Sequence, residues 1–431
     1  MPTRLLVFLI VALAVLTADL RPEAPGWAGS AAWADDDDDG GSDDDDDDDD
    51  DAPRRRRPAP QARVAPLPLR APNEVIAQGL APQDLQALQA EGFRVLRETR
   101  LAAGTPLVRL RKPDAMTMDA ARDRVRAIGS ADAADFNHFY RPGNAPVPAA
   151  ECRGADCPAR QMIAWPARTS GCGNPPRIGM VDTGLNPGHD VLKDSRITVH
   201  RIEAGKGVAP SDRLHGTAVA ALLVGRADSR TPGLVPQAEL IAVDAFHKQR
   251  QDERADAFAL VEALDHLAAQ DVDIVNLSLA GPPNQALARQ IRQMDRQGIV
   301  LVAAAGNGGP AARPAYPAAY DPVIAVTAVD RRAQVYRRAS RGGHIDLAAP
   351  GVDVWTAASI SGARTKTGTS FAAPFVTAAA ALLLQAEPGL APAEVRRRLQ
   401  ASAQDLGKAG PDEVFGHGLV RPADPCAVPR P

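Results

Sequence analysis

The hydrophobic pattern of residues 73–142 predicts a small α+β unit. Short apolar segments with strand-like alternation are separated by two segments in which apolar residues recur at helical spacing. Their order, strand-helix-strand-strand-helix-strand, is typical of a split β-α-β sandwich of the ferredoxin-like type. The pattern predicts strands over residues 74–77, 93–96, 107–110 and 136–140, and helices over residues 82–90 and 117–128.

The stretch from residue 161 to residue 426 has a different pattern. Its strands are continuous apolar runs separated by amphipathic helices, so we predict an α/β fold with a buried parallel sheet and helices on both faces. Residues 143–160, which contain proline and glycine, are predicted to link the two units. The expected strands cover residues 178–181, 240–243, 272–277, 299–304, 323–327 and 345–347, and the expected helices cover residues 217–224, 255–269, 285–297, 370–385 and 392–402.

The first 34 residues have the features of an export signal. Arg4 precedes a run of twelve apolar residues (5–16), and Ala32-Trp33-Ala34 is a small-x-small cleavage site. An uncleaved anchor is the alternative, but a bilayer span needs about 20 apolar residues. We therefore expect a cleaved signal peptide and a protein that is secreted, periplasmic or held at the cell surface, with no further membrane segment.

Residues 35–72 are predicted to form a disordered linker. Fourteen aspartates lie between Asp35 and Asp51, and an arginine run and a proline-rich stretch follow. Like charges repel one another, and there is little apolar surface to bury. A solvated spacer is a better interpretation than a calcium site, because carboxylates without fixed geometry hold cations loosely.

The aspartate tract also determines the net charge. The whole chain has 49 basic and 53 acidic residues, a balance of −4, whereas without the tract 49 basic residues face 39 acidic ones. The acidity therefore belongs to one segment and says little about the partners of the folded part. No nucleic-acid partner is expected.

Four cysteines fit an exported protein with disulfides: Cys152, Cys157, Cys172 and Cys426. Three pairings are possible. A zinc site is a poorer interpretation, because the first two cysteines form a C-x₄-C spacing without a neighbouring histidine. A local Cys152–Cys157 loop would leave Cys172 to pair with Cys426, and this is the pairing that we favour.

Three motifs lie where an α/β sheet places its chemistry, at strand ends and helix starts. Asp182 in D-T-G ends the first strand, His215 in H-G-T opens a helix, and Ser370 in G-T-S-F-A-A-P opens the long helix. Serine is a poor nucleophile until a histidine takes its proton, and a buried aspartate must orient and stabilise that histidine. The three residues together therefore predict a hydrolase.

A fourth residue completes this set. Asn307 follows an apolar strand, and its side-chain amide can donate a hydrogen bond to a developing oxyanion. The backbone N–H of Ser370, at a helix start, is the expected second donor.

These motifs, in this order, resemble those of the subtilisin-like serine proteases. The resemblance covers about residues 161–420 and includes further segments, namely Gly233-Leu234-Val235-Pro236, Asn276-Leu277-Ser278-Leu279-Ala280-Gly281, Tyr316-Pro317 and Ala349-Pro350-Gly351. It implies a serine endopeptidase that acts on proteins or peptides through an acyl-enzyme. In that mechanism Ser370 is the nucleophile, His215 the base, Asp182 its orienting partner and Asn307 the oxyanion donor.

The resemblance also implies a substrate groove. A substrate strand would pair with residues 277–281, and small residues would leave an apolar slot for the side chain before the scissile bond, the P1 residue. Such a slot should accept medium or large apolar side chains and reject Asp and Glu, which would lose solvation without gaining a partner. The implied substrate-binding residues are Leu277, Ser278, Leu279, Ala280, Gly281, Ala304, Gly306 and Ala315.

By the same resemblance, residues 73–142 look like the family's pro-region, which assists folding and plugs the active site until it is removed. The protein is then a monomeric zymogen that its own pro-region inhibits. Phe139 and Tyr140 would be offered to the P1 slot, with self-cleavage between about Phe139 and Arg160. Residues 225–232 are too short for the calcium-binding loop of many relatives, so no cofactor or metal is expected, although calcium elsewhere is left open.

Two other classes of protein share part of this pattern. A catalytically silent binding protein on the same fold is disfavoured by the intact set of Asp182, His215, Asn307 and Ser370. The sedolisin-like branch also uses a G-T-S serine but pairs it with glutamate and aspartate at acidic pH. His215 argues against that branch, and the pH dependence of the rate would separate the two.

Overall fold

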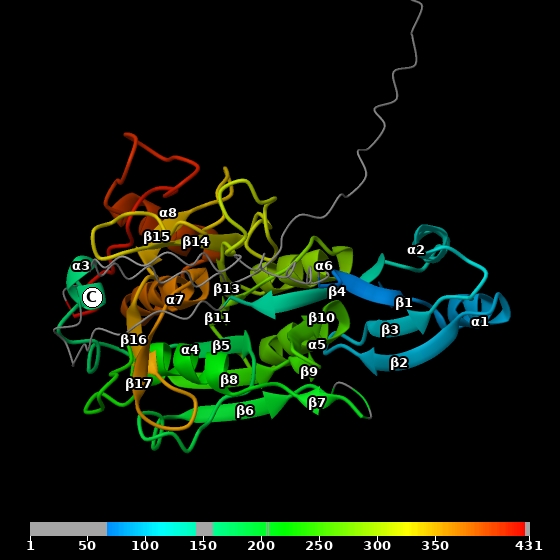
Figure 1. Cartoon of the computed structure of the whole chain (residues 1–431), viewed down its shortest axis with the longest axis horizontal. Helices are drawn as coiled ribbons and strands as arrows, with labels where there is room; N and C mark the ends of the chain where they lie inside the picture. The colour runs from blue at the N-terminus through cyan, green and yellow to red at the C-terminus, as the bar shows by residue number, and fades with distance from the viewer. Residues whose placement is uncertain (1–66, 144–157, 204, 206, 427–431) are drawn as a thin grey trace, which may run out of the picture. The chain divides into compact units, whose positions relative to one another are not determined.

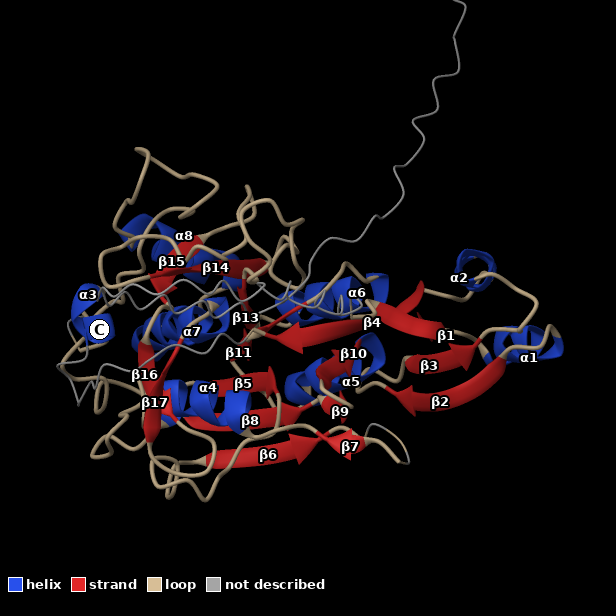
Figure 2. Cartoon of the chain, viewed as in Figure 1, coloured by secondary structure: helices blue, strands red, loops and turns tan. Residues whose placement is uncertain are grey.

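The computed structural model describes residues 67–143, 158–203, 205 and 207–426 (Figure 1). The predicted signal peptide, the aspartate tract, Cys152 and Cys157 lie outside the described residues. In the described part the six predicted elements of the first unit occur in the predicted order, and an α/β unit follows them (Figure 2).

The first unit is an antiparallel sheet covered by two helices. Helix α1 begins with a proline, which suits a first-turn position, and the Thr117 hydroxyl caps α2 by accepting the Ala120 N–H. The strands lie in the order β2-β3-β1-β4, and Val75, Leu88 and Val125 belong to the core between sheet and helices. The elements are β1 (Arg70–Gln78), α1 (Pro82–Ala90), β2 (Arg94–Arg100), β3 (Pro106–Arg111), α2 (Met118–Arg126) and β4 (Ala133–Pro142).

Seven parallel strands form the sheet of the second unit, and this confirms the predicted fold class. Their order is β15-β14-β13-β11-β5-β8-β6, so the strand order reverses between β5 and β11. In open α/β sheets the carboxyl ends of the strands at such a reversal form the binding crevice. The strands are β5 (Arg177–Asp182), β6 (Ile197–Arg201), β8 (Glu239–Asp244), β11 (Ile274–Leu277), β13 (Val300–Ala304), β14 (Val323–Val329) and β15 (Leu347–Pro350).

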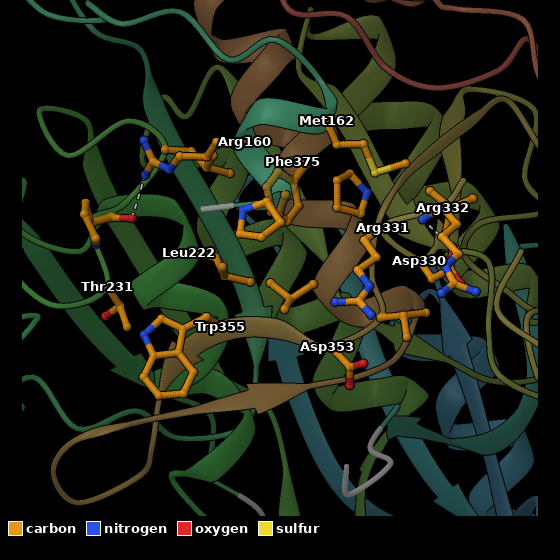
Figure 3. Close-up of a pocket in the computed structure, with 18 residues that line it drawn as sticks. Arg160, Met162, Leu222, Thr231, Asp330, Arg331, Arg332, Asp353, Trp355 and Phe375 are labelled. Carbon is orange, nitrogen blue, oxygen red and sulfur yellow. Dashed lines mark hydrogen bonds between the residues drawn. The ribbon is translucent and has the colours of Figure 1, made fainter. Parts of the chain in front are cut away.

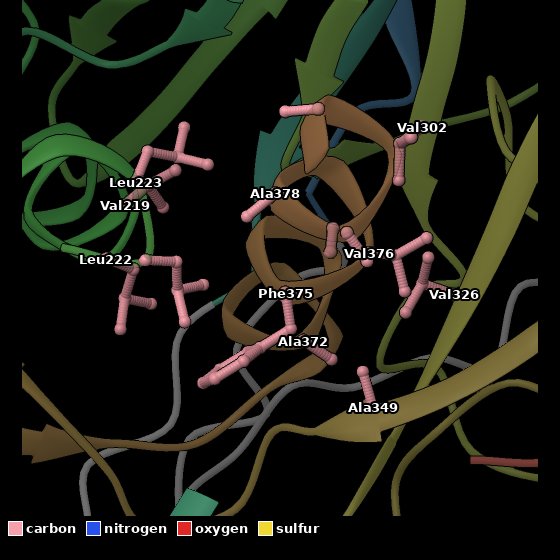
Figure 4. Close-up of a cluster of buried hydrophobic side chains, with 14 of the residues drawn as sticks. Val219, Leu222, Leu223, Val302, Val326, Ala349, Ala372, Phe375, Val376 and Ala378 are labelled. Atoms are coloured by element: carbon pink, nitrogen blue, oxygen red, sulfur yellow. The ribbon is translucent and has the colours of Figure 1, made fainter. Parts of the chain in front are cut away.

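Helices cover both faces of this sheet. Helices α4 (Leu214–Val224) and α7 (Thr369–Ala386) belong to one hydrophobic core, and α5 (Ala257–Ala268) and α6 (Gln285–Arg296) belong to the other. The alanines of α7 let it pack closely between α4 and the sheet (Figure 4). Among the described helices, α7 alone has the length and apolar character of a membrane span, and 89% of that stretch is buried in the protein.

Several short elements were not predicted. All but one are short strands with charged or mixed sequences, whose pairing is set by tertiary contacts rather than by periodicity, and the exception is a short helix. Strand β10 occupies the start of the predicted helix over residues 255–269, which begins only at Ala257 because Asp256 caps α5 by accepting the Ala259 N–H at 2.9 Å. Besides β6, these elements are α3 (Pro158–Met162), β7 (Ala209–Pro210), β9 (His247–Gln249), β10 (Asp252–Asp256), β12 (Leu279–Ala280), β16 (Val354–Ala357) and β17 (Ala363–Lys366).

A disulfide joins Cys172 to Cys426 across 254 residues of sequence. This is the long-range pairing that a local Cys152–Cys157 loop would leave. It connects the start of the second unit to the segment after α8 (Pro392–Ser402). The Cys152–Cys157 bond stays a prediction.

Strand β4 is shared between the two units. Its first part pairs with β1, whereas near its end Tyr140 lies opposite Ala255 of β10 and Arg141 lies opposite Ala280 of β12. The sheet of the first unit therefore continues through β10 into β9 and β7 (Figure 2). This pairing brings the residues after Tyr140 to the segment that follows β11.

Candidate active site

Asp182 and His215 form a buried pair. Asp182 is the last residue of β5, and His215 lies in the first turn of α4. Oδ1 of Asp182 lies 2.7 Å from Nδ1 of His215, and the two side chains are 1% and 0% exposed. The same carboxylate oxygen accepts the Thr183 N–H at 2.7 Å. The carboxylate thus fixes the imidazole ring with Nε2 free for proton transfer.

The other residues of the D-T-G and H-G-T motifs hold this pair in place. A Cβ on Gly216 would lie 2.4 Å from the carbonyl oxygen of Thr183, so α4 can approach the end of β5 this closely only with glycine there. Oγ1 of Thr183 accepts the Gly216 N–H at 3.0 Å, and Oγ1 of Thr217 accepts the Asn186 N–H at 2.8 Å. The two motifs therefore interlock through their small and hydroxyl-bearing residues.

Ser370 lies in the first turn of α7. Gly368 caps this helix with φ +150°, and a Cβ there would lie 3.1 Å from Nδ2 of Asn307. Pro374 has no N–H to give to the Ser370 carbonyl, and Oγ of Ser278 donates to that carbonyl at 2.8 Å instead. The proline of the motif therefore leaves a backbone acceptor that links α7 to the segment after β11.

The nucleophile and the base are not hydrogen-bonded to each other in this structure. Nε2 of His215 has no hydrogen-bond partner among the described residues. The imidazole ring packs near Phe371, with 5.2 Å between the two ring centroids. Oγ of Ser370 donates to the Ser278 carbonyl at 3.1 Å and accepts the Gly143 N–H at 3.3 Å. Catalytic hydrogen bonds of this type often tighten only in the reacting complex, so this geometry is compatible with the predicted roles.

The amide of Asn307 is held so that its nitrogen, like Oγ of Ser370, faces Gly143. Its Oδ1 accepts the backbone N–H and the hydroxyl of Thr369, both at 3.0 Å. Nδ2 is thereby directed at the chain in the cleft, where a Cβ on Gly143 would lie 2.3 Å from it. The side-chain amide and the helix start can thus donate together to one oxygen.

The end of β4 occupies this cleft like a bound strand. It pairs antiparallel with β10 on one side and with β12 on the other, and Gly143 reaches both Ser370 and Asn307. The expectation that Phe139 and Tyr140 are offered to the P1 slot is therefore wrong. The register of the pairing puts Gly143, three residues further along, at the nucleophile.

Tyr140 and Phe139 have other surroundings. A Cβ on Gly281 would lie 2.4 Å from the Tyr140 ring, whose hydroxyl donates to the Pro282 carbonyl at 3.0 Å. Burial raises the pKa of this phenol well above its usual value, so the group is a neutral donor. The Phe139 ring lies 3.7 Å from the guanidinium of Arg254.

The comparisons with known proteins agree with this geometry. The model of the subtilase family matches residues 173–418, more than half of the chain. The chain belongs to the subtilase family. Subtilisin DY of Bacillus licheniformis is 33% identical over 250 residues, which cover 57% of this chain and 88% of that protein. The subtilisins among its relatives indicate a serine-type endopeptidase.

Two other relatives extend the comparison. The minor extracellular protease Epr of Bacillus subtilis strain 168 is 30% identical over 267 residues, covering 61% of this subtilase but only 40% of Epr. Fervidolysin of Fervidobacterium pennivorans, a keratinolytic enzyme related to subtilisin, aligns in structure with a TM-score of 0.70. That alignment covers 84% of this chain and 62% of fervidolysin, and at 20% identity it shows a shared fold.

The structure brings together most of the predicted substrate-binding residues of this subtilase. Leu279 and Ala280 pair with the β4 tail, and the Ser278 carbonyl meets Ser370. A Cβ on Gly306 would lie 3.2 Å from Cβ of Ala315 and 3.7 Å from that of Ala280, so these small residues face one another as expected for a slot.

Two of the predicted substrate-binding residues lie elsewhere. Leu277 is the last residue of β11, paired with Val181 and Ala303 inside the parallel sheet, and Ala304 is buried in the core around α7. For Leu277 the reason is that the apolar strand ends one residue before the segment that leaves the sheet. Contact of either residue with a substrate stays a prediction.

Sequence reasoning missed a buried carboxylate beside the pair. Asp244 ends β8 directly opposite Asp182, and both of its oxygens lie 2.9 Å from Oγ of Ser211. The same hydroxyl accepts the Gly184 N–H at 2.9 Å, so Asp244 supports the loop that follows Asp182. Burial, aided by the charge of Asp182, raises the pKa of Asp244. Its place at a strand end, like that of Asp182, was the available signal.

A cavity of about 510 Å³ lies apart from these residues (Figure 3). Leu222, Phe375 and Met162 give it apolar walls, with Arg331 and Asp353 also at its edge. Neither the Asp182–His215 pair nor Ser370 lines it, so it is not the substrate slot. Within the described ranges no group of three or more histidine, cysteine, aspartate or glutamate side chains could hold a metal ion.

His138 makes the attachment of β4 sensitive to pH. Its Nδ1 lies 3.1 Å from Nδ2 of Asn284 and accepts from it, which requires the neutral ring. Burial lowers the pKa of His138 to about 4, with Arg70 and Arg122 acting in the same direction and Asp135 opposing them. The unfolded chain binds this proton near pH 6.5, whereas the folded chain binds it only near pH 4. The free energy of unfolding therefore keeps its full value above about pH 6.5 and falls as the pH drops toward 4.

We therefore expect unfolding of the uncleaved chain at pH 5 to need about 2 kcal/mol less, on account of His138, than at pH 8. Denaturant titrations at the two pH values measure this difference. In His138→Gln, whose amide oxygen can still accept from Asn284, the difference should shrink by that amount. An unchanged difference in the variant would assign the pH dependence to other groups.

Proposed function

We propose that this subtilase is an exported serine endopeptidase, made as a zymogen that its own β4 tail inhibits, with a preference for apolar P1 residues. One observation carries the proposal: β4 lies between β10 and β12 as an extra strand, with Gly143 at Ser370 and Asn307. Strand addition of this kind is how extended peptides bind at a sheet edge.

The geometry supports acyl transfer in two halves. Oγ of Ser370 attacks the carbonyl carbon of the scissile bond and passes its proton to Nε2 of His215. Asp182 holds Nδ1–H and stabilises the imidazolium that forms. The oxyanion accepts from Nδ2 of Asn307 and from the N–H of Ser370. His215 then protonates the leaving amine as the scissile C–N bond breaks. A water molecule attacks the acyl carbon with His215 again as the base, and the ester bond to Ser370 breaks as Oγ takes the proton back from His215, which releases the acid product.

The register supports a proposal for the bond that the zymogen cuts in itself. Gly143 is the residue at Ser370 and Asn307, so the scissile bond is the one that follows it. Glycine puts no side chain into the slot around Gly306, so self-cleavage does not report on P1 preference. The tail that remains after the cut stays paired with β10 and β12 and competes with substrates.

Export accords with the signal-like first 34 residues and with Epr, which is an extracellular protease. We propose a monomer that needs no cofactor.

The test is a paired analysis of the purified full chain. Amino-terminal sequencing should find a new terminus at Asn144, and a library of peptides varied at P1 should be cut best after medium or large apolar residues. A new terminus outside residues 140–161 would contradict the zymogen proposal. Strict preference for arginine, lysine or acidic residues at P1 would contradict the apolar slot and leave the zymogen proposal intact.

A further inference from the structure

Arg141 of the bound tail makes a two-point contact with a buried carboxylate. Its Nε lies 2.7 Å from Oδ1 of Asp252, and its Nη2 lies 2.9 Å from Oδ2. Asp252 begins β10, one of the two strands that pair with the tail, and its side chain is 8% exposed. Paired contacts of a planar guanidinium with a carboxylate are stronger and more directional than contacts of an ammonium group.

Only one of the two oxygens of Asp252 has a second hydrogen-bond partner besides Arg141 in the described structure. Arg254 donates from Nη1 to Oδ2 at 2.7 Å, and it belongs to the same strand as Asp252 rather than to the tail. Oδ1, in contrast, accepts only from Arg141 within the part of the chain that the structure describes. Burial alone would raise the pKa of Asp252, but Arg141 and Arg254 hold it below its usual value, so the group is ionised.

The backbone register connects this contact to the scissile bond. Arg141 lies opposite Ala280, and Gly143 lies at Ser370, so Arg141 is the third residue before the bond that the zymogen cuts. A substrate that replaces the tail along β12 in this register places its own third residue beside Asp252. Arg141 also donates to the carbonyl of Pro68, which belongs to the first unit and is absent from a substrate complex.

We propose that Asp252 is a specificity-determining residue that selects substrates with a basic residue at the third position before the scissile bond, and that it prefers arginine to lysine there. This inference rests on the proposed peptidase function. An uncharged residue there leaves Oδ1 of Asp252 without its partner, and an acidic one adds repulsion. The favoured substrates are therefore extended segments with arginine two residues before the P1 residue.

The experiment compares peptides that copy residues 138–147 and carry Arg, Lys, Gln or Glu at the position of Arg141. The self-cleaved enzyme should cut the Arg peptide with a kcat/KM at least about tenfold above that for Gln, with Lys between them and Glu lowest. In Asp252→Asn the Arg-to-Gln ratio should fall to about two or less. Asp228→Asn, which removes one carboxylate from an exposed ion pair with Arg226, is the charge-matched control and should keep the wild-type ratio.

Arg254→Gln separates recognition from a structural role. If Asp252 merely holds β10 in place through Arg254, this variant should lose the preference too; if Asp252 reads the substrate, the Arg preference should persist. Equal kcat/KM for the Arg and Gln peptides in the wild-type enzyme would overturn the selection by Asp252 and leave the peptidase proposal standing. Failure to cut any of the four peptides or any library peptide would overturn the proposed function, and this inference with it.

Discussion

Ser370→Ala is expected to abolish peptide hydrolysis and self-cleavage while the protein still folds. The variant lacks the atom that, in the described structure, is placed to attack the carbonyl of Gly143, and kcat should fall by about 10⁶-fold, as in the related subtilisin. The change to the fold is small, because Oγ makes two hydrogen bonds, to the Ser278 carbonyl and from the Gly143 N–H, and the loss of each costs about 1 kcal/mol.

Gel electrophoresis and a chromogenic peptide assay measure this outcome. The Ser370→Ala chain should keep its full length during incubation, whereas the wild-type chain is cut after Gly143. Ser402→Ala is the control, because this serine lies in α8 and its hydroxyl contacts only the Leu399 and Arg421 carbonyls in the described structure. Continued cutting of purified Ser370→Ala would mean that another group is the nucleophile.

The parallel sheet could be predicted because its strands are buried on both faces. Such strands are unbroken apolar runs, and β5, β8 and β14 begin and end within two residues of their expected bounds. The reactive residues follow for the same reason, since Asp182 ends such a run and Ser370 opens an apolar helix. At these places the local hydrophobic pattern and the position in the folded protein agree, and such agreement is what allows a structure to be predicted from a sequence.

The groove could not be predicted in the same way, because its strands are specified by distant partners. Residues 252–256 read Asp-Glu-Arg-Ala-Asp, which has no strand periodicity, yet β9 and β4 pair with them on their two sides. The register between β4 and β12 is likewise invisible in either segment alone. The sequence therefore suggests Phe139 and Tyr140 as the residues at the P1 slot, whereas the pairing of β4 with β10 and β12 places Gly143 there.

Asp182→Ala is expected to reduce kcat/KM by about 10⁴-fold without removing the nucleophile. The 2.7 Å contact with Nδ1 is the only described hydrogen bond of the His215 side chain, since Nε2 has no partner in the described structure. Without the carboxylate the ring loses its orientation, and the imidazolium formed during attack has lost its nearest counter-charge. Asp244, the next carboxylate in the sheet, supports Ser211 rather than His215 and does not replace it.

Measurement of kcat and KM separately tests this reading. The loss should appear in kcat, because Asp182 stabilises the transition state. In the described structure its carboxylate hydrogen-bonds His215 and the Thr183 N–H, not the β4 tail that stands in for substrate. Asp190→Asn, which alters the carboxylate beside His189, is the matched control and should retain wild-type kcat. A loss confined to KM would show that Asp182 shapes the groove rather than the chemistry, and Ser370 would then need a different partner to accept its proton.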